Sequence, residues 1–109
     1  QGDLTVIVEE RNYAFAPADL PRFLAMYERE GVFIATRLLG NLIGYFRTEV
    51  GPDLNEVVHL WGFEDLNDRA RRRQALWADP EWLDFAARCP SPVRQRNRLL
   101  SPTAWSPIR

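Results

Sequence analysis

The chain of 109 residues contains no lysine, and all fourteen of its basic residues are arginine. This absence excludes a Schiff-base lysine and the phosphate-binding lysine of a P-loop. The serines stand at positions 91, 101 and 106, near the end of the sequence, and none lies in a G-x-S-x-G motif. The nucleophile elbow of the α/β hydrolases is therefore missing as well.

Cysteine and histidine occur once each, as Cys89 and His59. A single cysteine excludes an internal disulfide and a multi-thiolate zinc site, and a single histidine excludes a two-histidine metal site within one chain. We therefore expect neither a metal nor a cofactor. One unpaired thiol is typical of a reducing compartment, which favours a cytoplasmic protein.

Long apolar runs and a strong net charge are also missing. No run approaches the roughly 18 apolar residues of a membrane helix, and the first residues show no signal-peptide pattern. The net charge of -1 gives no general attraction to nucleic acid or to anionic lipid. We expect no membrane span and no nucleic-acid partner. Gln1 and Gly2 look like a tag remnant, so a single domain is expected over residues 3–109.

The apolar periodicity that is present predicts alternating strands and helices. The expected order is strand 4–15, helix 20–39 with Gly31 as a cap or a break, strand 41–51, strand 56–63, helices 66–78 and 80–89, and strand 93–101. Asp19, Asp65 and Asp79 are the expected helix N-caps. This is the split βαβ pattern: an α+β, ferredoxin-like βαββαβ subunit whose four-stranded antiparallel sheet carries its helices on one face.

Strand alternation sorts the side chains of the sheet into two sets. One set is small or apolar, and we expect it to face the helices: Val6, Val8, Gly44, Phe46, Thr48, Val58, Leu60 and Gly62. The other set mixes charges with large aromatic rings, and we expect it to point away from them: Ile7, Glu9, Arg11, Tyr13, Ile43, Tyr45, Arg47, Glu49, Val57, His59, Trp61 and Phe63.

A water-facing surface seldom carries so many aromatic rings, and a dry core does not hold unpaired charges. A lined cavity satisfies both demands. It would form if two such sheets packed face to face in a homodimer, as a dimeric α/β barrel. In the alternative, the charges pair with one another across strands and the space between the sheets is only a wet interface.

The sequence resembles the NIPSNAP family over nearly its whole length. The resemblance rests on the stretches "VEERNY", "LPRFLAMYEREG", "LLGNLIGYFRTEVGPDLNEVVHLWGFEDLNDRARRR", "DPEW" and "NRLLSPTAWSPIR". It implies a ferredoxin-like subunit and a dimer, and it implies no particular reaction. Some eukaryotic members are mitochondrial and linked to vesicle traffic or mitophagy, so the resemblance implies a cytoplasmic protein for a bacterial-type member and a mitochondrial one for a eukaryotic member.

Each candidate residue has a functional and a structural interpretation. His59 could act as an acid or base near neutral pH, or it could donate to Glu9 or Glu49 and order the interface. Arg11 and Arg47 could hold a carboxylate or phosphate, or they could form a ladder with the two glutamates. Tyr13, Tyr45 and Trp61 could stack on a flat ligand, or simply pack.

Other conspicuous residues favour a structural interpretation. Arg69, Arg71, Arg72 and Arg73 are expected to form a solvated helix surface with Asp65 and Asp68 as partners. Cys89 is expected to be a buried, inert thiol. Trp105 is expected to anchor the C-terminal tail on its own subunit or on the partner.

Three functions remain open at this point. The first is a homodimeric binding or accessory protein that holds a small ligand with acidic and apolar parts in the barrel. The second is an enzyme of the dimeric α/β-barrel type, similar to cofactor-free monooxygenases or isomerases, with His59 as acid or base. The third is a structural interaction module whose cavity has collapsed.

Overall fold

One layer of the structure is an antiparallel sheet of four strands in the order β2-β3-β1-β4. The computed structural model describes residues 7–109, so the expected tag remnant and the start of the first predicted strand lie outside the described residues. The strands are β1 (Ile7–Ala14), β2 (Asn41–Arg47), β3 (Glu56–Phe63) and β4 (Arg94–Leu100).

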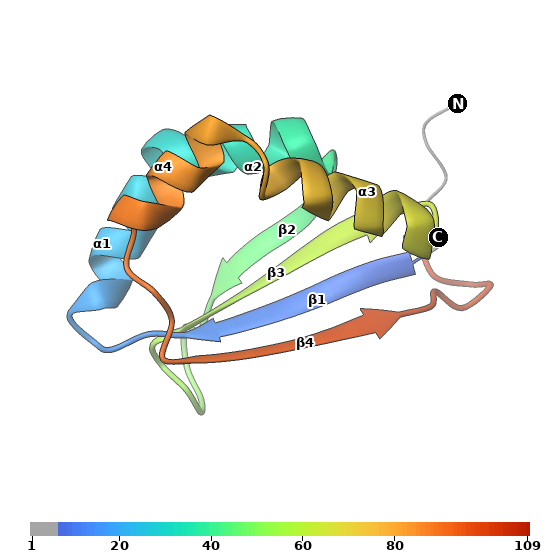
Figure 1. Ribbon diagram of the computed structural model, residues 1–109. Coiled ribbons are helices and arrows are strands. Elements are labelled where there is room, and N and C mark those ends of the chain that lie inside the picture. The colour runs from blue at the N-terminus through green and yellow to red at the C-terminus, as the bar shows by residue number, and fades with distance from the viewer. Residues whose placement is uncertain (1–6) are drawn as a thin grey trace.

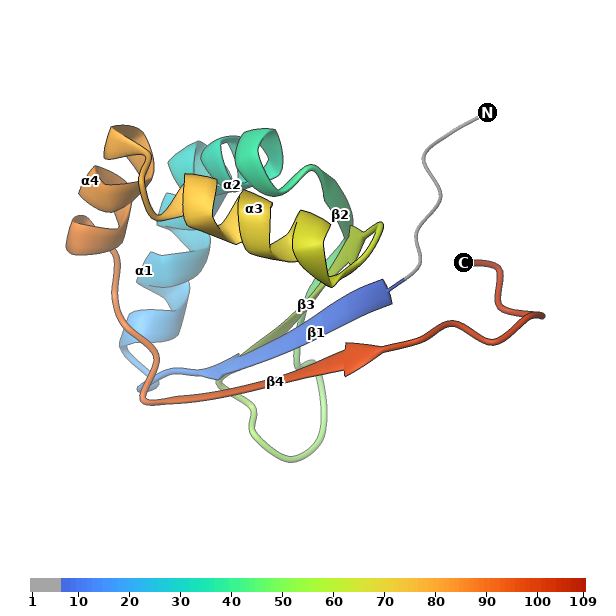
Figure 2. The same cartoon turned by 45° about the vertical axis from the view of Figure 1, so that its right-hand side comes forward.

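The second layer is helical and covers only one face of the sheet, as Figures 1 and 2 show. Its elements are α1 (Asp19–Met26), the π-helix η1 (Tyr27–Gly31), α2 (Val32–Leu39), α3 (Leu66–Leu76) and α4 (Pro80–Arg88). This arrangement confirms the predicted α+β, ferredoxin-like subunit. Within residues 7–109, no helix is long and apolar enough to cross a membrane.

Two of the three predicted helix caps are confirmed. The Asp65 side chain accepts a hydrogen bond from the Asp68 backbone N–H at 2.7 Å, and Asp79 accepts one from Trp82 at 3.1 Å. The cap predicted at Asp19 is wrong, because Asp19 is already the first residue of α1 and the N-cap position is Ala18. Ala18 has no side-chain oxygen, so α1 begins without a side-chain cap.

Gly31 neither caps nor breaks the first helical segment. It lies in η1, and helical backbone continues on both sides of it. A Cβ atom at this position would come within 2.6 Å of the Phe85 ring and 2.7 Å of Tyr27. Glycine therefore allows α4 to pack closely against the π-turn, which is a tertiary requirement that local helix propensity does not reveal.

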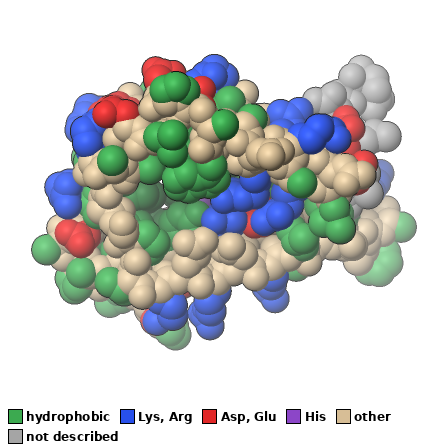
Figure 3. Space-filling view, viewed as in Figure 1, with side chains coloured by type: hydrophobic (Ala, Val, Ile, Leu, Met, Phe, Trp, Pro, Cys, Tyr) green, Lys and Arg blue, Asp and Glu red, His purple; other side chains and the backbone are tan. Residues whose placement is uncertain are grey.

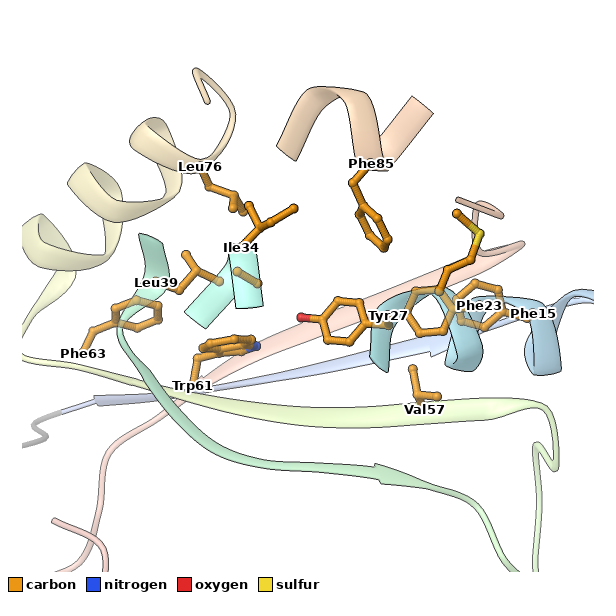
Figure 4. Packing of buried hydrophobic residues seen from close by; sticks show 12 residues of the cluster. Phe15, Phe23, Tyr27, Ile34, Leu39, Val57, Trp61, Phe63, Leu76 and Phe85 are labelled. Carbon is orange, nitrogen blue, oxygen red and sulfur yellow. The ribbon is translucent and has the colours of Figure 1, made fainter. Parts of the chain in front are cut away.

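The hydrophobic core lies between the sheet and the helices (Figure 4). Val57, Trp61 and Phe63 rise from β3 into this layer and are at most 2% exposed. The prediction that Trp61 points away from the helices is therefore wrong, and so is the same prediction for Glu9, Arg11, Tyr13, Tyr45 and His59. The bulky rings of β3 bury more apolar area under the helices than Val58 and Leu60 would, and area decides which face is covered.

The opposite face of the sheet has no helix over it (Figure 2). Its apolar half includes Phe46, which is 56% exposed and stands opposite Val58 in the strand register. Its polar half includes Glu10, which pairs with Arg98 at 2.9 Å. This outer sheet face thus combines an apolar area with a charged area.

The C-terminal tail does not use Trp105 as an anchor on its own subunit. Trp105 is 82% exposed, so this part of the prediction is wrong. Anchoring on a partner subunit stays a prediction.

Candidate functional site

Six of the eight candidate residues predicted to share one face of the sheet do so, on the side that the helices cover. In the strand register Glu9 stands opposite Trp61 and Arg11 opposite His59, while Tyr45 flanks His59 from the other side. A register shift between Leu42 and Gly44 precedes this pairing and does not disturb it. Alternation therefore identified the group correctly, and the tertiary structure turns it toward the protein interior.

Arg47 and Glu49 do not join this group. Their side chains pair with each other at 3.5 Å and are 59% and 81% exposed. Glu49 lies beyond the end of β2, in the connection to β3. The prediction that these two residues take part in the site has no support in the geometry, because Arg47 is the last residue of β2 and its exposed side chain pairs with Glu49 beyond the strand.

The group borders a cavity of about 300 Å³ between the sheet and the helices. Figure 3 shows the hollow below the helix layer, with hydrophobic side chains on one side and basic side chains on the other. The polar members of its wall include Arg11, Tyr13, His59 and Arg73, and the apolar ones include Tyr27, Leu76, Trp77, Trp82 and Phe85. The cavity thus lies within one subunit, whereas the sequence predicted it between two sheets.

A buried carboxylate at the edge of this wall is held by two arginines. Glu9 is 1% exposed and accepts hydrogen bonds from Arg69 at 2.9 and 3.0 Å and from Arg11 at 2.7 Å. Burial opposes ionisation of Glu9, but Arg69 and Arg11 together lower its pKa below the ordinary value. Arg11 also donates to the Tyr13 hydroxyl at 2.8 Å. We call Glu9, Arg11, Arg69 and Arg73 the Glu9 cluster.

Arg73 is the member of the cluster that has no counter-ion. It is half-buried in the cavity wall, and its guanidinium makes no hydrogen bond or ion pair with any residue in the range 7–109. Burial and the neighbouring charge of Arg11 lower its pKa. With Glu9 as the sole carboxylate among three arginines, the cluster has an uncompensated positive charge.

The prediction that all four arginines of α3 form a solvated surface is therefore only half right. Arg71 and Arg72 pair with Asp68 as expected, at 3.4 and 2.9 Å. Arg69 and Arg73, by contrast, turn inward. They share a helical stripe with Leu76, which is 2% exposed. Because α3 has few other apolar residues, the position of Leu76 was the signal that could have identified the inward stripe.

His59 lies in the middle of the sheet and is 4% exposed. Burial and the charge of Arg11 lower its pKa to about 3, against a weaker opposing effect of Glu9. Its Nδ1 accepts a hydrogen bond from the Trp61 indole N–H at 2.8 Å. The predicted pairing with Glu9 or Glu49 is wrong, because the Glu9 oxygens already serve arginines and Glu49 lies in the solvent-exposed connection after β2.

Aromatic rings surround the imidazole. Tyr45 stacks on His59 with 4.3 Å between ring centroids and 19° between the planes, and Tyr13 meets it edge-on at 4.8 Å. Tyr27, presented by the π-helix, packs against Tyr45 at 4.9 Å. Burial raises the pKa of both Tyr27 and Tyr45 well above the ordinary value, so both are neutral phenols. The result is a rigid, uncharged aromatic wall next to the Glu9 cluster.

The remaining polar groups of the wall constrain the chemistry. The indole N–H of Trp82 and the Nε2 atom of His59 are buried without a hydrogen-bond partner in the described part of the chain. Cys89 is half-buried, whereas the sequence predicted a buried thiol. Burial raises the pKa of Cys89 to about 11, which fits the inert character expected of it. Across residues 7–109, no three His, Cys, Asp or Glu side chains come together as candidate metal ligands.

This arrangement is better suited to holding an acceptor than to removing a proton. The Nδ1 lone pair of His59 is occupied by Trp61, and Glu9 is saturated by arginine. A general base needs a free lone pair within reach of its substrate and a pKa near the working pH. The catalytic assignment of His59 stays a prediction. In this geometry His59 has no free basic nitrogen, because its Nδ1 atom accepts the hydrogen bond from Trp61.

Comparison with known proteins covers almost the whole chain. The NIPSNAP family model matches residues 8–107. Protein NipSnap homolog 3A of Homo sapiens is 30% identical over 77 residues, and Protein NipSnap homolog 1 of Danio rerio is 35% identical over 69 residues. These matches cover 71% and 62% of this chain but only 30% and 24% of the relatives. The chain therefore spans about a third or less of the length of these relatives.

Solved structures agree at higher identity. A NIPSNAP family protein from Agrobacterium tumefaciens superposes with a TM-score of 0.92 and 40% identity, covering 100% of this chain and 96% of that one. A NIPSNAP-like domain protein from Burkholderia xenovorans superposes with a TM-score of 0.89 and 48% identity, covering 96% of this chain and 91% of that one. The oxygenase SnoaB from Streptomyces nogalater shares the fold alone, at 15% identity and a TM-score of 0.59, covering 93% of this chain and 96% of that one. This chain belongs to the NIPSNAP family.

Proposed function

We propose that the protein binds a small anionic molecule with an apolar body in the cavity between its helices and its sheet. The observation that carries this proposal is the unpaired Arg73 in the cavity wall. A buried or half-buried charge is normally paired, because leaving water without a partner costs free energy. A carboxylate or similar anion beside Arg73 would supply the missing partner.

The rest of the Glu9 cluster makes a protein partner for Arg73 hard to find. Both Glu9 oxygens accept from Arg69 or Arg11, and Asp68 serves Arg71 and Arg72 on the outer side of α3. Arginine holds carboxylates with a planar, two-pronged donor set. The ligand's charged group therefore belongs at the basic end of the cavity.

The apolar part of the wall suits the body of the ligand. Tyr27, Trp77, Trp82 and Phe85 present flat rings to the same space. A volume of about 300 Å³ lies at the lower end of the range for small-molecule sites. The open cavity also speaks against the third hypothesis, in which Trp61, Tyr45 and ion pairs fill the space and the protein serves only as a structural module.

The test is binding of simple aromatic acids and their neutral amides. Trp61, Trp77 and Trp82 border the cavity, so tryptophan fluorescence reports on binding and calorimetry checks it. We expect phenylacetate to bind and phenylacetamide to bind about tenfold more weakly or worse. In Arg73→Gln the acid should lose this advantage while the amide is unaffected.

Arg71→Gln is the matched control. Arg71 lies two positions away on the same helix, but its side chain is 67% exposed and pairs with Asp68. The Arg71→Gln substitution should leave the affinities for phenylacetate and phenylacetamide unchanged. Equal binding of acid and amide by the wild-type protein, or equal effects of the two substitutions, would contradict the proposal.

We also propose that the protein is a homodimer that pairs through its outer sheet face. The half-exposed Phe46 opposite Val58 supports this, because an apolar area on an uncovered sheet is typical of an interface. The NIPSNAP resemblance favours the same assembly. A cytoplasmic location stays a prediction that rests on the single thiol of Cys89.

A further inference from the structure

The protonation pattern of His59 is fixed by its neighbour. Trp61 Nε1 can only donate, so the 2.8 Å bond to His59 requires an acceptor at Nδ1. A neutral imidazole that accepts at Nδ1 carries its proton on Nε2. His59 is therefore a hydrogen-bond donor at Nε2.

The orientation of this donor is fixed as well. Tyr45 stacks on one face of the imidazole, Tyr13 touches it edge-on, and Trp61 holds Nδ1. The ring cannot flip without losing the bond to Trp61 and repacking Tyr45 in a crowded layer. Such a preset donor loses little freedom when it binds an acceptor.

Nε2 nevertheless has no hydrogen-bond partner among residues 7–109, although His59 is 4% exposed and borders the cavity. A buried donor without an acceptor costs free energy, and proteins keep such groups mainly where a ligand completes them. His59 belongs to the sheet side of the cavity and Arg73 to the helix side. Two donors on opposite sides can hold two different acceptors of one molecule.

We propose that His59 Nε2–H selects ligands that carry a ketone oxygen in addition to their acid group, so that the ligand class is a small oxo acid. This inference rests on the proposed function, in which Arg73 takes the carboxylate. A ketone oxygen accepts a hydrogen bond and has no proton of its own to place, so it suits a site whose free polar atoms are donors. Trp61 acts as a positioning residue, because it sets the tautomer of His59.

The experiment compares 4-oxo-4-phenylbutanoate with 4-phenylbutanoate, which differ by the ketone oxygen alone. We expect the wild-type protein to bind the oxo acid about tenfold more tightly, or better. His59→Gln keeps an amide N–H near the position of Nε2 and should retain part of this preference. His59→Phe should abolish the preference, so that the two acids bind this variant with equal affinity.

A measurement on the ligand-free protein tests the tautomer of His59 even if a variant fails to fold. The nitrogen-15 shifts of the single imidazole report which nitrogen carries the proton. We expect protonated Nε2 in the wild-type protein and a mixture of tautomers in Trp61→Phe, with a matching loss of preference for the oxo acid. Protonated Nδ1 in the wild-type protein overturns the proposal.

The outcomes also separate this inference from the proposed function. If both acids bind through Arg73 with equal affinity, the ketone oxygen gains nothing from His59. In that case only the proposed role of His59 is overturned, and the proposed function stands. If neither acid binds but phenylacetate does, the oxo-acid inference alone is overturned. If phenylacetate does not bind either, both proposals are overturned.

Discussion

Arg69 on helix α3 donates two hydrogen bonds to Glu9 on strand β1, from Nε at 2.9 Å and from Nη2 at 3.0 Å. The pair joins the helix layer to the sheet at a position where Glu9 is 1% exposed. Arg73 follows one helical turn later, so the same contact holds Arg73 against the cavity. The site and the packing of α3 therefore depend on one buried carboxylate.

Glu9→Gln should strongly destabilise the protein. The substitution leaves Arg11 and Arg69 without their shared anion in a buried position, which typically costs about 3–5 kcal/mol. Urea denaturation measures the loss. Glu10→Gln is the control, since its carboxylate lies on the outer sheet face and pairs with a 68% exposed Arg98 side chain. We expect it to change the free energy of unfolding by less than about 1 kcal/mol. Similar losses in both variants would contradict the described role of Glu9.

Stability should fall with decreasing pH in a window that belongs to His59. Its folded pKa of about 3 lies below the unfolded value of 6.5, so between these values the unfolded chain binds a proton that the folded chain rejects. The free energy of unfolding should therefore decrease as pH falls below about 6.5, by up to about 1.4 kcal/mol per pH unit.

The carboxylates do not obscure this window. Glu9 and Asp68 have lowered pKa values, so their contributions are lost only as pH falls below the ordinary values of 4.5 and 3.8. Chemical denaturation from about pH 5 to 6.5 should thus show a slope in the wild-type protein and a nearly flat profile in His59→Gln. An unchanged slope in the variant would show that another group titrates there.

Gly31→Ala should destabilise the fold although alanine is the better helix former. The new methyl group meets the Phe85 ring at 2.6 Å, and overpacking of this kind costs about 1–3 kcal/mol. Phe85→Leu opens space beside it, so Gly31→Ala should cost about 1 kcal/mol less in that background. A double-mutant cycle in urea measures the coupling. The same cost in both backgrounds would mean that Phe85 is not the obstacle.

Phe46→Asp should convert the proposed homodimer into a monomer. Phe46 is 56% exposed in the isolated subunit, so a charge there should disturb the subunit little and an apolar interface a great deal. Light scattering at micromolar concentration gives the mass. Val50→Asp is the control, because Val50 is 88% exposed in the β2–β3 connection. A wild-type monomer, or a dimer that survives Phe46→Asp, would rule out this interface.

Local patterns in the sequence predict the order of the elements and most of their limits. Apolar periodicity placed the strands and helices, and the Asp65 and Asp79 caps are local hydrogen bonds that a few adjacent residues define. Strand alternation also grouped Arg11, Tyr45 and His59 correctly. These features depend on neighbours in the chain, which is why they can be read from it.

The side of the sheet that this group faces depends, by contrast, on tertiary packing. Alternation shows that residues share a face but not which face is covered, and both faces carry apolar side chains. The charges of Glu9 and Arg11, taken alone, argue against a buried position. Yet Arg69, 60 positions beyond Glu9 in the chain, donates to the Glu9 carboxylate and offsets the free-energy cost of burying these charges. Because that partner comes from a distant helix, the location of the cavity and the unpaired state of Arg73 could not be read from the sequence.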